Sequence, residues 1–173
     1  PPADTENNED AESTEMDTAL SVDSVELWSQ CGDQKIFGVM YQPKETTGPL
    51  PTVILAHSSS LTHAAMSGYA LAIAQMGYAA YCFDFCGGSS QSRSDGSTDE
   101  MTIFTEVEDL RAVVDTLRTK PYVEASKLYL LGSSQGGLVS ALLADERTDD
   151  FAGMILFYPA FNIPELINQL GSL

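Results

Sequence analysis

The pentapeptide Gly132-Ser133-Ser134-Gln135-Gly136 constrains the fold more than any other feature of this 173-residue chain. A short apolar run at 128–131 precedes it, and the segment 138–144 that follows has the pattern of a buried helix. Small residues in the pentapeptide permit a tight turn that packs a strand against the next helix. Such a turn raises its central serine above the end of a sheet, and the helix start offers backbone N–H groups to a developing oxyanion. Ser134 is therefore a candidate nucleophile.

The patterns on either side of the pentapeptide predict strands and helices in alternation. Two alternating segments separated by Gly32 and Asp33 predict an antiparallel hairpin. The clearest helix runs from Ile103 to Leu117, where apolar residues recur at helical spacing, and Thr102 or Asp99 is expected to cap it. The predicted strands are 22–30, 35–41, 52–56, 78–85, 127–131 and 154–158, and the predicted helices are 64–76, 103–117 and 135–145. This order predicts an α/β fold, a mostly parallel sheet with an N-terminal antiparallel hairpin, present up to about its sixth strand.

The formal charge of -17 is distributed unevenly along the chain. No Lys or Arg precedes Lys35, and residues 1–21 are acidic with few apolar side chains, so we expect a disordered tail or linker there. A solubilising leader is the simpler interpretation, with an acidic partner-binding segment as the alternative, and an exported or cell-surface location is favoured over a cytoplasmic one. The charge argues against nucleic acid as a partner, and no apolar run is long enough for a membrane span.

Three cysteines, Cys31, Cys82 and Cys86, show no metal-ligand spacing, so we expect no metal and no cofactor. Cys82 lies in an apolar run and is expected in the core. A Cys82–Cys86 disulfide is disfavoured, because it would require the strand to end between the two residues.

Polar residues follow three of the predicted parallel strands. His57, Asp84 and Ser134 each fall at or just beyond a carboxyl end, which is where open α/β sheets bind ligands. The Gly- and Ser-rich segment 87–98 is expected to be a loop without core residues, with Arg93 and Asp95 on its surface.

These motifs, in this order, resemble the α/β-hydrolase superfamily, and specifically its serine esterases and lipases. The resemblance covers about 22–158 and rests on three segments, which are His57-Ser58-Ser59, Asp84-Phe85-Cys86-Gly87-Gly88-Ser89 and Gly132–Gly136. Gln135-Gly136-Gly137 is similar to the corresponding segment of cinnamoyl and feruloyl esterases and lysophospholipase-like enzymes.

The resemblance implies a role for each motif residue. Ser134 is the nucleophile, the backbone N–H groups of Gln135 and Ser59 form the oxyanion hole, and His57 braces the loop after the third strand. Gly132 and Gly136 support the turn. Asp84 is expected to anchor the turn at 87–88 rather than to orient a histidine.

The chain departs from the family pattern at two points. Ser58 and Ser59 stand where the family has glycine and an aromatic residue, and serine adopts positive φ poorly. The family's triad acid and base follow the serine, after later strands. In this chain both histidines precede the serine. His57 is the predicted loop brace, and His63 is predicted to be a solvated or capping residue. We therefore expect a C-terminal fragment or second chain to complete the sheet and the triad, and residues 159–173 to begin a lid or cap insertion.

Together these observations favour a serine carboxylic ester hydrolase that forms an acyl-enzyme on Ser134 and acts on a small-molecule acyl ester. A serine peptidase or acyltransferase of the same fold remains an alternative. A non-catalytic hydrolase-fold binding module is the alternative from another class.

Overall fold

The computed structural model describes residues 19–162. Most of the predicted acidic tail (1–18) and the predicted start of the lid beyond residue 162 lie outside the described residues. Just before the first strand, Leu20 N–H donates to the Gln75 carbonyl at 3.2 Å. The strands are β1 (Val22–Cys31), β2 (Gln34–Pro43), β3 (Leu50–Ala56), β4 (Ala79–Phe83), β5 (Val123–Ser133) and β6 (Gly153–Phe157). The helices are α1 (Ser67–Gln75), α2 (Ile103–Arg118) and α3 (Gln135–Glu146), with short 3₁₀ turns η1 (His63–Ala65) and η2 (Thr148–Asp150).

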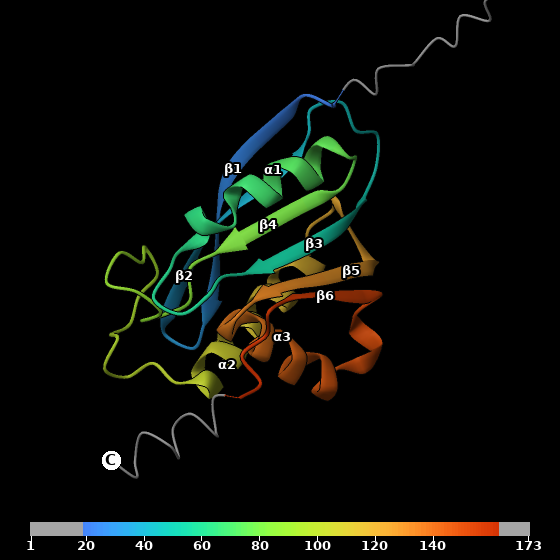
Figure 1. The fold of residues 1–173 in the computed structure, drawn as a ribbon. Helices are drawn as coiled ribbons and strands as arrows, with labels where there is room; N and C mark the ends of the chain where they lie inside the picture. The colour runs from blue at the N-terminus through green and yellow to red at the C-terminus, as the bar shows by residue number, and fades with distance from the viewer. Residues whose placement is uncertain (1–18, 163–173) are drawn as a thin grey trace, which may run out of the picture.

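The described strands form one six-stranded sheet in the order β1-β2-β4-β3-β5-β6 (Figure 1). The pairs β1–β2 and β2–β4 are antiparallel, and the pairs from β4 to β6 are parallel. The hairpin turns at Gly32, whose φ of 56° suits glycine. The predicted α/β fold with an antiparallel start is therefore confirmed.

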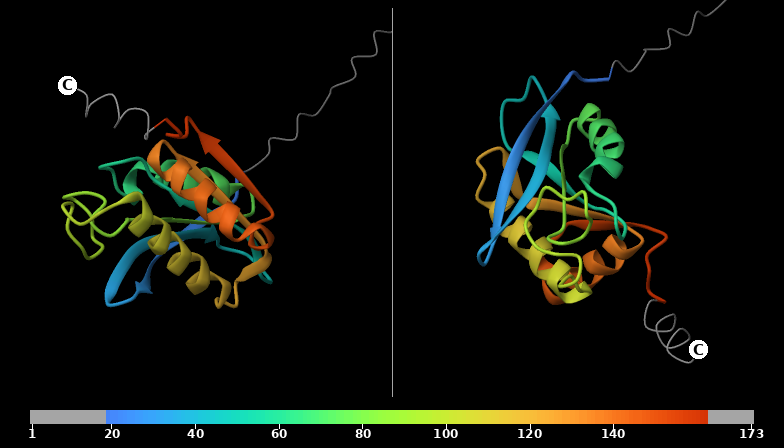
Figure 2. Two further views of the ribbon diagram at one scale, coloured as in Figure 1. Left: turned by 90° about the horizontal axis from the view of Figure 1, so that it is seen from below. Right: turned by 90° about the vertical axis from the view of Figure 1, so that its left-hand side faces the viewer.

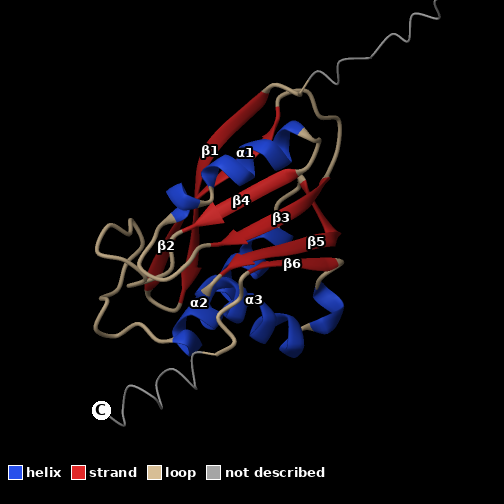
Figure 3. Cartoon of the chain, in the orientation of Figure 1, coloured by secondary structure: helices blue, strands red, loops and turns tan. Residues whose placement is uncertain are grey.

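The helices form layers on both faces of the sheet, with α1 on one side and α2 and α3 on the other (Figures 2 and 3). Side chains of β3 alternate between the two cores, as the period of a strand requires. Ile54 and Ala56 pack in the cluster that contains Leu110 of α2, whereas Val53 and Leu55 pack in the cluster under α1. The continuous apolar run of β3 is explained by this burial on both faces.

The largest differences from the predicted bounds are at the starts of β5 and α1. Strand β5 begins at Val123, before the predicted 127, and its pairing with β3 shifts register between Leu50 and Thr52. Residues 124–127 of β5 are half-buried or exposed, so no apolar alternation marks the start of this strand. Helix α1 begins at Ser67 rather than 64, because the 3₁₀ turn η1 occupies residues 63–65.

The parallel strands bring the predicted site segments to one edge of the sheet. Ala56 pairs with Gly132, so the loop after β3 lies directly beside the turn at Ser134. Asp84 follows β4, on the other side of β3. In Figure 1 the arrowheads of β3 and β4 point to this edge, and the loop that leads to α2 lies at the same end.

Candidate active site

Ser134 lies between β5 and α3 in an unusual backbone conformation, with φ of 49° and ψ of -117°. Such a conformation costs on the order of 1–3 kcal/mol and persists where the surroundings enforce it. Three contacts do so: Ser134 N–H donates to the Phe157 carbonyl at 3.0 Å, and the Ser134 carbonyl accepts from Gly137 and Ala160 at 3.0 and 2.9 Å. The half-buried Ser134 hydroxyl forms no hydrogen bond with another described residue. Within residues 19–162, its donor and acceptor capacity is therefore unused.

The two outer glycines of the pentapeptide are needed for close packing. A Cβ at Gly132 would lie 2.4 Å from the Gly136 carbonyl oxygen. A Cβ at Gly136 would lie 2.4 and 2.5 Å from the carbonyl oxygens of Ala56 and His57. The start of α3 therefore packs directly against the end of β3, with Ser134 in the turn immediately before it.

The two predicted oxyanion donors come from adjacent elements. Gln135 is the first residue of α3, so its N–H has no acceptor one turn back within the helix. Ser59 is exposed in the loop after β3. The role of Gln135 and Ser59 as a pair of main-chain donors stays a prediction.

The serine at position 58 has a structural use. Its φ is not positive; in this loop the positive φ, 59°, falls at Ser60. The Ser58 hydroxyl lies 2.9 Å from the hydroxyl of Ser133, the residue before the candidate nucleophile. This hydrogen bond ties the loop after β3 to the turn at Ser134, and the glycine of the family pattern is not required for the loop conformation seen here.

His57 is buried and has both ring nitrogens engaged. Phe85 N–H donates to Nε2 at 3.3 Å, so Nε2 is the acceptor and Nδ1 donates to the Ser58 carbonyl at 2.8 Å. Burial lowers the pKa of His57, and the hydrogen bond to Ser58 acts in the opposite direction. The neutral ring thus connects the segments that follow β3 and β4, the arrangement expected of a loop brace.

Asp84 binds a histidine, contrary to expectation. Its Oδ1 accepts from the backbone N–H and the ring Nδ1 of His63, at 2.6 and 2.7 Å. Its Oδ2 accepts from the Arg93 backbone N–H at 2.8 Å, so the carboxylate anchors the loop at 93 rather than the turn at 87–88. His63 is therefore held by Asp84 and is not a plain solvated residue. The sequence predicted the anchor at the wrong turn. The backbone N–H that Asp84 binds belongs to Arg93, nine residues further along the chain, and no local pattern marks this contact.

Arg93 and Asp95 are exposed as predicted, but each makes specific contacts. The Arg93 guanidinium lies 3.5 Å from the centroid of the Phe37 ring and bonds to both carboxylate oxygens of Glu26. Asp95 Oδ2 accepts from the Lys35 backbone N–H at 2.8 Å. The loop is thereby fastened to β1 and β2, although it has no apolar pattern.

Sequence reasoning missed two buried carboxylates on α2. Glu106 Oε2 accepts from Gln135 Nε2 at 2.7 Å, and Asp109 Oδ2 accepts from the Cys86 backbone N–H at 2.7 Å. Burial raises the pKa of Glu106 to about 7 and that of Asp109 to about 6. In the sequence, both carboxylates stand beside the apolar stripe of an amphipathic helix, where charged residues are ordinarily solvated. Only the positions of α3, for Glu106, and of the segment after β4, for Asp109, identify them.

The cysteines are free thiols, and burial raises the pKa of Cys82 to about 12. Among residues 19–162 no group of three or more His, Cys, Asp or Glu side chains is placed to hold a metal ion. Within the same range, no helix is both long and apolar enough to cross a membrane.

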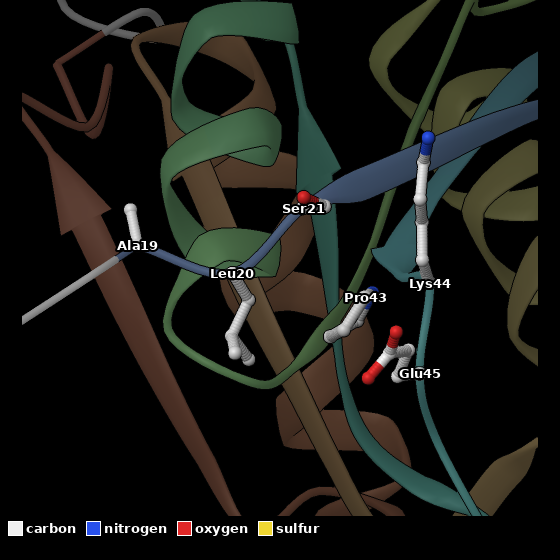
Figure 4. Close-up of a pocket in the computed structure, with 6 residues that line it drawn as sticks. All are labelled: Ala19, Leu20, Ser21, Pro43, Lys44 and Glu45. Atoms are coloured by element: carbon white, nitrogen blue, oxygen red, sulfur yellow. The ribbon is translucent and has the colours of Figure 1, made fainter.

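A hollow of about 310 Å³ lies where β1 begins and β2 ends (Figure 4). It is lined by Ala19, Leu20, Ser21, Pro43, Lys44 and Glu45. Pro43 pairs with Val22 at the start of β1, and β2 runs antiparallel to β4. This hollow is therefore at the end of the sheet opposite the candidate active site.

Residues 47–173 match the family described as serine aminopeptidase, S33. The chain belongs to this family. Its fold is that of the α/β-hydrolases, in agreement with the sequence resemblance.

Solved structures show the same fold over part of their length. Est1E from Butyrivibrio proteoclasticus, determined with bound ferulic acid, is 26% identical with a TM-score of 0.72, and the match covers 83% of this chain and 56% of Est1E. The α/β-hydrolase GrgF from Penicillium sp. sh18 is 20% identical with a TM-score of 0.67, over 88% of this chain and 53% of GrgF. The chain thus spans a little more than half the length of these proteins.

Proposed function

We propose that the protein is a serine carboxylic ester hydrolase that works through an acyl-enzyme on Ser134. The single observation that carries the proposal is the backbone of Ser134, with φ of 49° and ψ of -117° at the junction of β5 and α3. A strand-to-helix turn of this conformation at the carboxyl edge of the sheet, where such folds bind ligands, supports a nucleophile at this position. The Ser134 hydroxyl has no hydrogen-bond partner among the described residues.

The proposed reaction has two steps. Ser134 Oγ attacks the acyl carbon, the bond to the alcohol oxygen breaks, and the alcohol leaves with a proton. Water then hydrolyses the acyl-enzyme and restores the Ser134 hydroxyl. Backbone N–H groups of Gln135 and Ser59 are the proposed donors to the oxyanion in both steps.

The described histidines are poorly placed to be the base. Both nitrogens of His57 are already hydrogen-bonded. His63 is bound to Asp84 beyond β4 and contacts the Phe37 ring of β2, with 5.0 Å between the ring centroids. Because β3 separates β4 from β5, and neighbouring strands lie about 4.8 Å apart, Asp84 and Ser134 are about 10 Å apart across the sheet. The proposal therefore assigns base and acid to sequence outside the described residues.

Within residues 19–162 the sheet is incompletely covered beside β6, and we take this as support for a C-terminal fragment or second chain as partner. Among the described strands, β6 pairs only with β5, and Ile155 is 50% exposed. An apolar hollow of about 280 Å³ beside it is lined by Val53, Ile73, Met76, Tyr78, Tyr129 and Ile155. Additional sequence packed here would bury this surface.

Two alternatives remain. The description of the matched family favours a serine peptidase as the second candidate, since the same nucleophile serves both reactions. The third candidate is a non-catalytic binding module.

The decisive experiment measures hydrolysis of p-nitrophenyl acetate, methyl ferulate and aminoacyl p-nitroanilides by the protein with its completing sequence. Ser134→Ala is expected to lower ester hydrolysis by a factor of about 10³ or more. Ser140→Ala is the matched control, because the Ser140 hydroxyl is buried in α3 without a partner among the described residues. Preferred cleavage of the anilide would favour the peptidase, and no Ser134-dependent turnover would favour the binding module.

A further inference from the structure

Glu106 makes the principal polar contact to the side chain of Gln135. Glu106 is 1% exposed and Gln135 is 8% exposed. Gln135 Nε2 donates to Glu106 Oε2 at 2.7 Å and lies 3.8 Å from Met101 Sδ. The contact joins the first residue of α3 to α2.

The start of α3 has few other side chains by which it can be held. Gly136 and Gly137 follow Gln135, and both are glycines because a Cβ at either position would meet backbone or Pro159 atoms at 3.1 Å or less. Gln135 therefore supplies the only side-chain anchor of the first three residues of α3. An anchor at the end of this side chain restricts the rotation of its own backbone N–H, which directly follows Ser134.

The group that holds Gln135 is a carboxylate, although burying a charge is costly. Burial raises the pKa of Glu106, the hydrogen bond from Gln135 lowers it, and the negative charge of Asp109 on the same helix raises it. Gln135 and Met101, the contacts from α3 and from the segment before α2, are uncharged. Glu106 accepts from Gln135 in either protonation state, and above about pH 7 its ionised form makes a stronger hydrogen bond than a neutral amide would.

We propose that Glu106 is a positioning residue for the reaction at Ser134, holding the Gln135 side chain and thereby the Gln135 backbone N–H at the oxyanion. The inference rests on the proposed ester hydrolase function. It adds a residue that touches neither substrate nor nucleophile.

The kinetic test compares Glu106→Leu, Glu106→Gln and the control Glu108→Gln, which changes an exposed residue of the same helix. With p-nitrophenyl acetate, Glu106→Leu is expected to lower kcat about tenfold or more and to leave KM within about twofold, because the lost interaction acts in the transition state. Glu106→Gln retains an acceptor oxygen and is expected to recover most of kcat. A folded Glu106→Leu variant with wild-type kcat would overturn the proposal.

A spectroscopic readout separates this inference from the proposed function. In ¹⁵N-labelled protein, the side-chain amide of Gln135 is expected to shift with pH with a midpoint near 7, in wild type and in Ser134→Ala, but not in Glu106→Gln. Absence of this shift in wild type would overturn the proposal even if ester hydrolysis depends on Ser134. A normal shift without Ser134-dependent hydrolysis would instead refute the proposed function and leave Glu106 a purely structural contact.

Discussion

Replacing Glu106 by Gln is expected to change how the stability of the fold depends on pH. The glutamine has the shape of the buried carboxyl and keeps an oxygen that can accept from Gln135 Nε2, but it removes the titrating group. Burial raises the pKa of Glu106 in the folded state, and unfolding returns this carboxyl to water. The free energy of unfolding therefore depends on pH through this one group.

The magnitude follows from the two pKa values. The folded state holds the Glu106 proton more tightly than the unfolded chain, since the pKa rises from 4.5 to about 7. Unfolding therefore releases a proton in this window, and the free energy of unfolding falls as the pH rises through it. One pKa unit corresponds to about 1.4 kcal/mol. The raised pKa of Glu106 therefore lowers the free energy of unfolding by about 3 kcal/mol at pH 8 and by about 1 kcal/mol at pH 5. The free energy of unfolding of Glu106→Gln minus that of wild type should therefore be about 2 to 3 kcal/mol larger at pH 8 than at pH 5.

Urea unfolding at these two pH values measures the effect directly. The quantity to compare is the difference between variant and wild type, because most other titrating groups cancel in it. Glu108→Gln, on the exposed face of α2, controls for removing one negative charge from the helix. A difference for Glu106→Gln that is equal at pH 5 and pH 8 would refute the reasoning, because Glu106 would then titrate alike in the folded and unfolded chains.

Two further predictions concern the local structure that supports the site. Gly136→Ala is expected to destabilise the protein by about 3 kcal/mol or more, because its Cβ would meet a carbonyl oxygen at 2.4 Å; Gly68→Ala, with open space around it in α1, should be neutral or stabilising in the same thermal melt. Thr102→Ala is expected to cost about 1 kcal/mol, since the Thr102 side chain caps α2 by accepting from Thr105 N–H at 3.1 Å. Thr102→Ser should retain the cap, and equal melting temperatures for the Ala and Ser variants would contradict the capping role.

The sequence predicted those parts of the fold that a repeating pattern or a local turn determines. The apolar spacing from Ile103 to Leu117 matches helix α2 almost to its ends, and Thr102 caps it as one of two predicted candidates. The pentapeptide predicted the strand–turn–helix at Ser134, because its requirement for small residues is purely local. The hairpin and the alternating order of elements determined the sheet type.

Contacts between segments distant in sequence could not be predicted in the same way. Asp84 binds His63 and the backbone at Arg93, and Glu106 binds Gln135, yet no periodicity marks a buried carboxylate that reaches across the fold. Glu106 has the pattern of the solvated flank of α2 until α3 is placed against it. Such side chains are recognised only from burial and from the donors that surround them.

Covalent labelling tests the central claim, that Ser134 is a catalytic nucleophile, most directly. A fluorophosphonate reacts with an activated serine and leaves a stable adduct that peptide mass spectrometry can locate. For the folded protein with its completing sequence, one adduct per chain is expected at Ser134, absent in Ser134→Ala and present in Ser140→Ala. An intact, folded preparation that remains unlabelled, or that is labelled at another serine, would contradict the account.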